Sequence, residues 1–137
     1  MELDWQYNNL TFTEDMIGDY YGFVYMITNL SNNKKYIGKK FFYSTKTRQV
    51  KGKKKRFKVE SDWREYYGSN KELLKDVETY GQKAFRREIL HLCKSKGDFA
   101  YLEAKEQFDR KVLESDLYYN DWIMCRIHGK HLTINKR

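Results

Sequence analysis

The sequence predicts a mixed α/β (α+β) fold in which a small three-stranded antiparallel β-sheet is flanked by helices. Two observations lead to this expectation. Segments 23–28 and 35–39 are β-rich apolar runs separated by turn-forming residues, which is the pattern of a β-hairpin. Further along, helix-like and strand-like segments alternate. The chain has 137 residues and no long low-complexity tract, so it is expected to form one domain, 1–137.

Residue types predict the first hairpin and the segments on either side of it. Between its two strands, residues 29–34 (Asn-Leu-Ser-Asn-Asn-Lys) carry side chains that bond their own backbone, and asparagine tolerates positive φ. Residues 1–20 are polar and acidic and are expected to form an N-terminal arm or short strand. Residues 61–67 predict a short helix that would place Trp63 and Tyr66 on one face.

The second half of the chain predicts two helices and a third strand. A helix over 70–80 is expected to begin after an N-cap at Ser69 and to end at Gly81, where a C-cap glycine belongs. Residues 84–92 alternate as a strand does. A second helix is expected from Asp98 to about Leu113. Its buried side chains are expected to be Phe99, Leu102, Phe108 and Val112.

The charge of the chain indicates a polyanionic partner. The formal net charge is +8 and the pI is near 9.3, which favours nucleic acid through phosphate neutralisation. Ten Lys or Arg and no acidic residue lie between Lys39 and Lys58. This basic insertion, 40–60, follows the first hairpin and is expected to bind DNA in a salt-dependent, sequence-tolerant way, either as a hairpin with its tip at 51–53 or as a flexible loop. The expected phosphate contacts are Lys39, Arg48, Lys53, Lys54, Lys55, Arg56 and Lys58.

Other sequence signals exclude several classes of protein. Cys93 and Cys125 are isolated thiols without CxxC spacing, so neither a zinc site nor a disulfide framework is indicated. No apolar run has the length of a membrane span, and no signal-peptide core is present near the N-terminus. We therefore expect no membrane partner and a cytoplasmic location.

Several motifs occur in the order found in one known family. Tyr25 and Tyr36 lie eleven positions apart on the predicted hairpin, and Tyr36 is followed by Ile37-Gly38. Tyr80-Gly81, Lys105-Glu106-Gln107-Phe108 and Tyr119-Asn120 follow later. From about Gly22 to Asn120 the chain resembles the GIY-YIG endonucleases, especially small phage-encoded Seg-like homing endonucleases. Phe23 departs from the pattern, since it occupies the place of the first glycine of the name motif.

The resemblance implies a metal-dependent active site. One tyrosine would take the proton of the attacking water and the other would orient it, with Tyr25 assigned as the base and Tyr36 as the orienting group. A free tyrosine titrates near pKa 10, so a tyrosine base needs cationic neighbours. Glu106 is the preferred ligand for Mg²⁺ (or Mn²⁺), and Glu103, one turn earlier on the same helix, is its rival.

The remaining implied groups bind the phosphate and support the metal site. Arg64 is the best match to the family's arginine, which would brace the scissile phosphate through paired donors. Arg48 is nearer in spacing, and Lys40 is an alternative source of positive charge. Asn120 would hydrogen-bond the backbone around the metal site and fix the helix against the sheet.

These residues predict a metal-dependent endonuclease that hydrolyses phosphodiester bonds in double-stranded DNA. A homing role and a role against host or competitor DNA both stay open. One active site handles one strand, so the protein would nick DNA or act as a homodimer. If it is phage-encoded, it would act in the host bacterial cytoplasm. The alternatives are a catalytically silent DNA-binding protein on the same fold and a general RNA-binding domain.

Overall fold

A computed structural model of the chain describes residues 4–124, and Cys125 lies outside this range. The main sheet has five strands in the order β2-β1-β7-β3-β4. The expected hairpin is confirmed as β3 (Gly22–Asn29) and β4 (Lys34–Phe41), and the third expected strand is β7 (Phe85–Cys93). Strand β3 is the centre of this group, because it pairs antiparallel with both β4 and β7.

The prediction of a three-stranded, wholly antiparallel sheet was wrong. The N-terminal arm adds β1 (Gln6–Tyr7) and β2 (Leu10–Thr11), and β1 runs parallel to β7. Two aromatic side chains in this polar segment explain the addition, since Trp5 and Phe12 are 1% and 4% exposed in the core. The Trp5 indole also donates a hydrogen bond of 2.7 Å to the carbonyl of Trp63.

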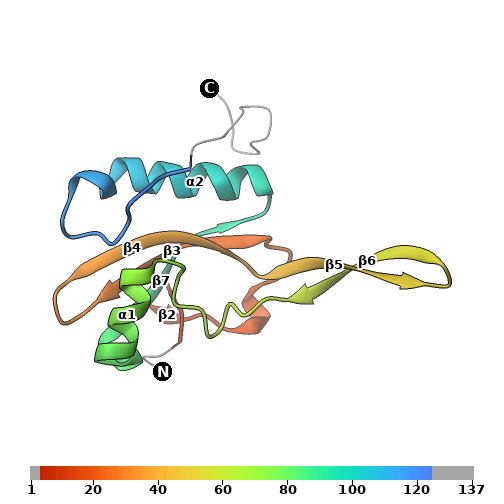
Figure 1. Cartoon of the computed structure of the whole chain (residues 1–137), viewed down its shortest axis with the longest axis horizontal. Helices are drawn as coiled ribbons and strands as arrows, with labels where there is room; N and C mark the ends of the chain where they lie inside the picture. The colour runs from red at the N-terminus through yellow and green to blue at the C-terminus, as the bar shows by residue number, and fades with distance from the viewer. Residues whose placement is uncertain (1–3, 125–137) are drawn as a thin grey trace.

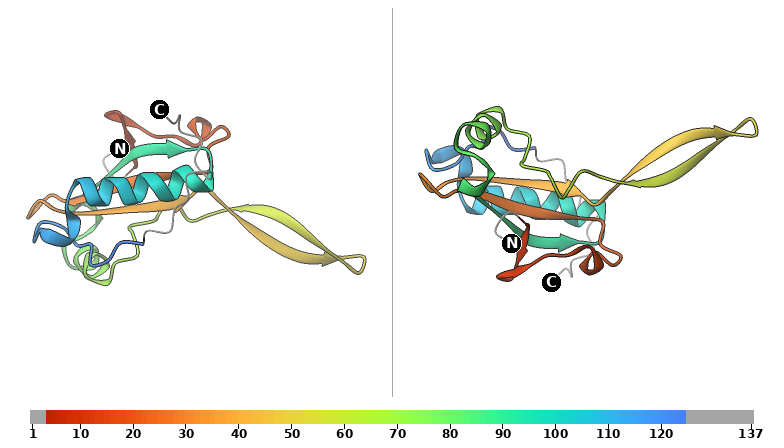
Figure 2. Two further views of the ribbon diagram at one scale, coloured as in Figure 1. Left: turned by 90° about the horizontal axis from the view of Figure 1, so that it is seen from above. Right: turned by 90° about the horizontal axis from the view of Figure 1, so that it is seen from below.

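The two faces of the sheet carry different layers (Figures 1 and 2). Helix α2 (Lys96–Asp109) packs on one face over a mostly aliphatic cluster that includes Val24 and Ile37. Helix α1 (Lys71–Tyr80) lies on the opposite side, where an aromatic cluster forms the larger core. Alternate residues of β3 therefore enter two separate cores, as the two-residue period of a strand requires.

The basic insertion forms a second, two-stranded sheet, so of the two expected forms the hairpin is the correct one. Strand β5 (Tyr43–Val50) pairs antiparallel with β6 (Lys53–Glu60) over eight residue pairs. Its turn consists of Lys51 and Gly52, both at positive φ (52° and 78°), as a tight hairpin turn of this kind requires. The hairpin projects from the body as an arm in every view (Figures 1 and 2).

The two helices are confirmed, with shifted starts. Asn70, and not Ser69, is the N-cap of α1, where its side chain accepts a hydrogen bond from the Leu73 amide. Gly81 ends that helix at φ 86°. The N-cap of α2 is Ser95, three residues before the expected start at Asp98.

Two other helix expectations were wrong. Helix α2 ends at Asp109, and beyond it only a 3-10 turn over Val112–Glu114 is helical, so Phe108 is 56% exposed and does not enter the core. Segment 61–67 forms turns in place of a helix. The buried guanidinium of Arg87 donates hydrogen bonds of 2.8 Å to the carbonyls of both Arg64 and Tyr66. These carbonyls are therefore satisfied from β7 without helical bonds.

Among the described residues, no helix has the length and apolar character needed to cross a membrane.

The position of the α1 cap can be tested by two neighbouring substitutions. Asn70→Ala removes the bond to the Leu73 amide and a 2.9 Å bond from the Asn70 side chain to the Tyr119 carbonyl. We expect it to lower the free energy of unfolding by about 1–2 kcal/mol. Ser69→Ala, at the position predicted from sequence, should change it by less than about 0.5 kcal/mol. Urea unfolding followed by circular dichroism measures both, and equal effects would contradict the assignment.

Candidate active site

Tyr25 and Tyr36 lie on neighbouring strands and point to the same face of the sheet. In the β3–β4 register Tyr25 is opposite Gly38 and Tyr36 is opposite Ile27, so the two tyrosines are diagonal neighbours. Their ring centroids are 6.2 Å apart. The hairpin therefore brings the two tyrosines together, as the sequence predicted.

Gly38 leaves the space that the Tyr25 hydroxyl occupies. A Cβ atom at Gly38 would overlap the Tyr25 hydroxyl oxygen and would lie 3.0 Å from the Tyr36 ring. Any side chain at this position would therefore displace the tyrosine pair. The Tyr-Ile-Gly motif therefore requires glycine at position 38 because its cross-strand partner, Tyr25, fills the space of a side chain.

The two tyrosines differ in access to solvent and in electrostatics. Tyr25 is 1% exposed, and burial raises its pKa well above 10, with further increases from Tyr66 and Tyr36. Tyr36 is partly exposed, and burial raises its pKa too, against a lowering hydrogen bond from Ser69. Neither shift has the direction that a tyrosine base requires. In the free protein both hydroxyls are neutral at pH 7.

Two lysines of β4 that could lower these pKa values are paired with carboxylates. Lys34 pairs with Glu72 at 2.7 Å, and Lys39 pairs with Glu103 at 3.0 Å. These ion pairs place a carboxylate beside each ammonium group, which reduces its field at the tyrosines.

Lys40, the other expected cation, lies close to the tyrosine cluster. Its ammonium group is 4.0 Å from the centre of the Tyr66 ring, but it also pairs with Asp62 at 2.6 Å. Tyr66 in turn packs edge-on against Tyr25 at 6.0 Å between centroids. Tyr66 is thus a third member of the tyrosine cluster, which sequence reasoning placed on a helix face without assigning it to the site.

A cavity of about 720 Å³ opens beside the edge strand β4. It contains several of the predicted site residues together with groups from α1, α2 and the segment after Tyr118. Tyr36 and Lys39 line it from β4, and Glu103 lines it from α2. The other lining residues are Ser69, Asn70, Lys71, Glu72, Gln107, Tyr119, Asn120, Asp121, Trp122 and Met124.

Glu103 is the carboxylate of α2 that faces this cavity. Its side chain is 14% exposed and accepts the 3.0 Å ion pair from Lys39. Burial raises the pKa of Glu103, an effect that outweighs the opposing ion pair with Lys39. Its charge also contributes to the raised pKa values of Tyr25 and Tyr36, so it lies within electrostatic reach of both hydroxyls.

Glu106 faces another part of the sheet and is not among the cavity residues. Its carboxylate lies 2.6 Å from the His91 imidazole on β7 and accepts a 2.9 Å bond from Arg110. Burial acts to raise the pKa of Glu106, but the bonds from Arg110 and His91 outweigh it and lower the pKa. The two glutamates are thus divided between opposite sides of β3, and the geometry favours the rival, Glu103, as the cavity carboxylate.

Asn120 holds the backbone of β4 at the cavity, as the sequence suggested for the backbone around the site. Its amide accepts a 3.0 Å bond from the Ile37 N–H and donates a 2.8 Å bond to the Ile37 carbonyl. Gln107 donates a second bond of 3.1 Å to the same carbonyl. The Gln107 side-chain oxygen is buried and has no hydrogen-bond partner among the described residues. A buried acceptor without a partner calls for an explanation such as a bound water or ion.

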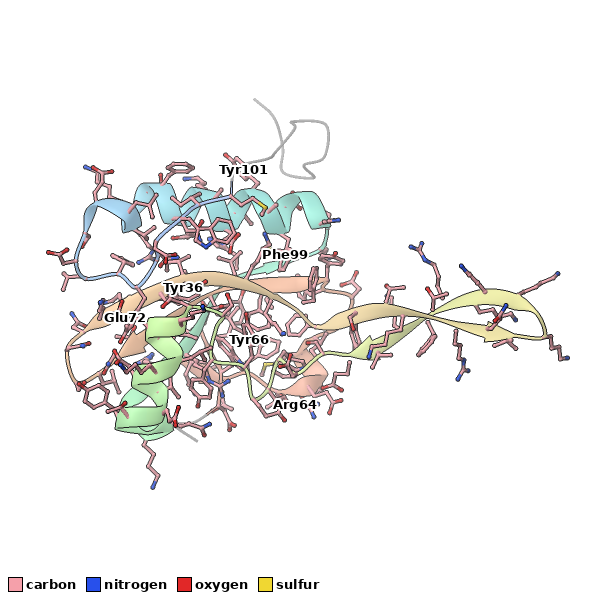
Figure 3. All side chains as sticks on the ribbon, viewed as in Figure 1. Tyr36, Arg64, Tyr66, Glu72, Phe99 and Tyr101 are labelled. Atoms are coloured by element: carbon pink, nitrogen blue, oxygen red, sulfur yellow. The ribbon has the colours of Figure 1, made fainter. Side chains whose placement is uncertain are left out.

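The predicted arginines lie outside this cluster. Arg64 pairs with Glu14 at 2.9 Å and Glu60 at 3.2 Å, and it is not a cavity residue. Figure 3 shows it at the outer surface of the turn segment, beyond Tyr66 from Tyr36. Arg48 lies on the projecting hairpin, where its guanidinium stacks 5.0 Å from the Phe57 ring. Lys39 is therefore the predicted cation that the fold places in the cavity.

The remaining predicted DNA-binding residues are all on the hairpin. They are exposed and comprise Arg48, Lys53, Lys54, Lys55, Arg56 and Lys58.

Gln107 and Asp121 are among the cavity residues that sequence reasoning did not assign to the site. Gln107 was quoted only as part of a motif, although its spacing of four from Glu103 places both on one helix face. Asp121, directly after Asn120, is exposed and adds a carboxylate that raises the pKa of Tyr36. No three His, Cys, Asp or Glu side chains among residues 4–124 cluster closely enough to form a complete metal site.

Comparison with known proteins shows the family of the chain. The profile of the family described as "Putative endonuclease segE, GIY-YIG domain" matches residues 5–123. "Putative endonuclease segE" of Enterobacteria phage T4 is 35% identical over 101 residues, which are 73% of this chain and 40% of that protein. The chain thus matches less than half of that relative's length. No solved structure matches the chain. Because the profile match spans most of the sequence, the chain belongs to the GIY-YIG endonuclease family.

Proposed function

We propose that this protein is a Mg²⁺- or Mn²⁺-dependent DNA endonuclease whose active site is the cavity beside β4. The observation that carries the proposal is the convergence of Glu103, Lys39 and Tyr36 on that cavity. A carboxylate, an ammonium group and a phenol are suited to a metal ion, a phosphate and a water molecule, respectively. Membership of the family supports the reaction class.

The donor set fits a hard divalent cation bound by few protein groups. The carboxylate of Glu103 has a raised pKa, so a nearby positive charge would stabilise its ionised form. The unpartnered oxygen of Gln107 is a second hard donor in the same cavity. Magnesium commonly uses one or two carboxylates and completes its shell with water and substrate oxygens. Bound there, it would supply charge neutralisation for the phosphate and for the leaving oxygen.

In the proposed site Tyr36 acts on the attacking water, a role supported by its position in the cavity lining. Its neutral hydroxyl oxygen can accept a hydrogen bond from that water and so direct it at phosphorus. Tyr25 is buried and takes a positioning role, in place of the role of base expected from the sequence. In the hydrolysis, the water oxygen bonds to phosphorus and gives up one proton, the bond to the 3′ oxygen breaks, and one proton is taken up by that leaving oxygen, so that one water is consumed.

Lys39 supplies the positive charge facing the phosphate in this proposal, and Arg64 does not. Lys39 is paired with Glu103 in the free protein. When Glu103 is engaged by a cation, the ammonium group can turn toward a phosphate oxygen, because its side chain is flexible.

The natural substrate is double-stranded DNA in the cytoplasm of a bacterial host, in keeping with the phage origin of the relative. One cavity cuts one strand, so a monomer nicks and a homodimer would be needed for a concerted double-strand break. Both a homing role and an attack on host or competitor DNA require this activity.

Two matched glutamine variants test the proposal on supercoiled plasmid DNA. Glu103→Gln should reduce Mg²⁺-dependent nicking by at least about a hundredfold, whereas Glu106→Gln should retain most of it. Mg²⁺ should also raise the midpoint of thermal unfolding of the wild type and of Glu106→Gln, but not of Glu103→Gln.

The controls decide between the alternatives. EDTA should abolish nicking by the wild type. Loss of nicking in Glu106→Gln alone would return the ligand role to Glu106. A wild type that shifts DNA in a gel but never cuts it with any divalent metal would establish a silent DNA-binding protein.

The raised pKa of the Glu103 carboxylate predicts how nicking depends on pH. Burial raises the pKa of Glu103 above its ordinary value of 4.5. Activity should therefore fall as the pH drops through this raised pKa, because protonation removes the charged ligand. A metal competes with the proton, so raising the Mg²⁺ concentration should move the midpoint to lower pH.

The measurement is kcat/KM for nicking between about pH 5 and 8 at two Mg²⁺ concentrations. Glu106→Gln serves as the control and should show the same displacement. A midpoint that does not depend on Mg²⁺ would contradict metal binding at Glu103.

A further inference from the structure

We propose that one face of the β5–β6 hairpin reads base edges in the major groove of duplex DNA. The inference rests on the proposed function in one respect, that duplex DNA is the substrate. It goes beyond electrostatic attachment because it assigns sequence recognition to particular side chains of the arm.

The strand register divides the hairpin into two chemically different faces. Residues directly opposite each other in an antiparallel pair point to the same side, and side chains alternate along each strand. One face, called the polar face, carries Tyr43, Thr45, Thr47, Gln49, Lys54, Arg56, Lys58 and Glu60. The other, called the mixed face, carries Ser44, Lys46, Arg48, Val50, Lys53, Lys55, Phe57 and Val59.

Side-chain contacts agree with this division. On the mixed face the Arg48 guanidinium lies 5.0 Å from the Phe57 ring centre. On the polar face the Lys58 ammonium lies 6.0 Å from the Tyr43 ring centre. The apolar residues Val50, Phe57 and Val59 of the mixed face are partly covered, whereas every residue of the polar face is exposed.

The polar face has the hydrogen-bonding groups that base recognition requires. Threonine, glutamine, arginine and lysine all bond to base edges in the major groove, where each base pair shows a distinct pattern of donors and acceptors. Within residues 4–124, the side chains of Thr45, Thr47 and Gln49 form no hydrogen bond to the protein. Their donors and acceptors are therefore available to a ligand.

The dimensions of the arm fit the major groove. Each strand has eight residues, which gives a length of about 27 Å at 3.4 Å per residue. A two-stranded ribbon fits a groove about 12 Å wide. Side chains on one face of a strand repeat about every 6.8 Å, which is the rise of two base pairs. Thr45, Thr47 and Gln49 can thus reach alternate base pairs when the strand follows the groove.

The fit distinguishes duplex DNA from duplex RNA. The major groove of an A-form helix is deep and too narrow for side chains to read, so the polar face has no equivalent site there. On DNA the long basic side chains of the mixed face, such as Lys46 and Lys55, can reach the phosphates at the rims of the groove. Attachment and recognition are then carried by opposite faces of one ribbon.

The experiment is a selection of bound sequences from a randomised DNA duplex, performed with the full chain carrying Glu103→Gln so that DNA is not cut. We expect enrichment of a short motif. Adding T45V, T47V and Q49M keeps the charge and approximate shape of the polar face. It removes the hydrogen-bonding groups of these three side chains. This variant should lose about tenfold or more of its preference for the motif over random DNA.

A matched control removes charge from the mixed face. K46Q with K55Q should weaken binding to all sequences equally. It should also reduce the slope of log affinity against log salt by about 0.9 for each phosphate that the arm no longer neutralises. It should leave the selected motif unchanged. Circular dichroism of each variant confirms that the strands persist.

Methylation of guanine N7, which lies in the major groove, provides a test that needs no arm variant. Methylated positions within the motif should block binding by the protein with its natural arm. Selection of no motif, insensitivity to N7 methylation, or equal affinity for duplex RNA would each overturn the proposal. Plasmid nicking by the wild type is scored separately, so groove reading can fail while the nuclease stands, and the reverse.

Discussion

The position of β3 between β4 and β7 is the constraint on which the rest of the structure depends. Because side chains alternate along a strand, Tyr25 enters the aromatic core while its neighbour Val24 lies under α2. Val24 pairs with Lys39 on one side and His91 on the other. These two basic residues thus lie in one row across the sheet beneath α2, and each receives one glutamate of the helix.

A β-bulge in β7 places His91 under α2 and so produces this arrangement of charges. The register between β3 and β7 shifts at Val24 and Tyr25, whose partners are His91 and Ile89, so that Leu90 is the extra residue. In regular alternation His91 would point to the same face as Ile89, into the aromatic core. The bulge turns His91 toward α2, where Glu106 meets it at 2.6 Å. Glu106 is thereby satisfied away from the cavity, and Glu103 is left beside the tyrosines.

The bulge also explains why some features of the site could be predicted from the sequence and others could not. The hairpin, the helix ends at Gly81 and the tyrosine pair follow from local patterns, and all were predicted. The sequence preferred Glu106 to Glu103 as the metal ligand, although the two face nearly the same way on a helix. The register of β7, which brings His91 to Glu106, does not follow from local patterns. The arm was expected to be an extension or a short strand, but its addition to the main sheet was not predicted, because it depends on the distant contacts of Trp5.

The arm and the body differ in how their basic side chains are paired. In the body Lys34, Lys39 and Lys40 each pair with a carboxylate. In the arm Arg48 lies directly opposite Lys55, and neither has a carboxylate partner among residues 4–124. Like charges at directly opposed positions destabilise a strand pair, and an isolated two-stranded hairpin is only marginally stable in water. In the proposed complex with DNA, phosphates would neutralise these side chains and relieve the repulsion, so DNA binding would stabilise the arm. The repulsion between these like charges would therefore be smallest when the arm lies against a polyanion such as DNA.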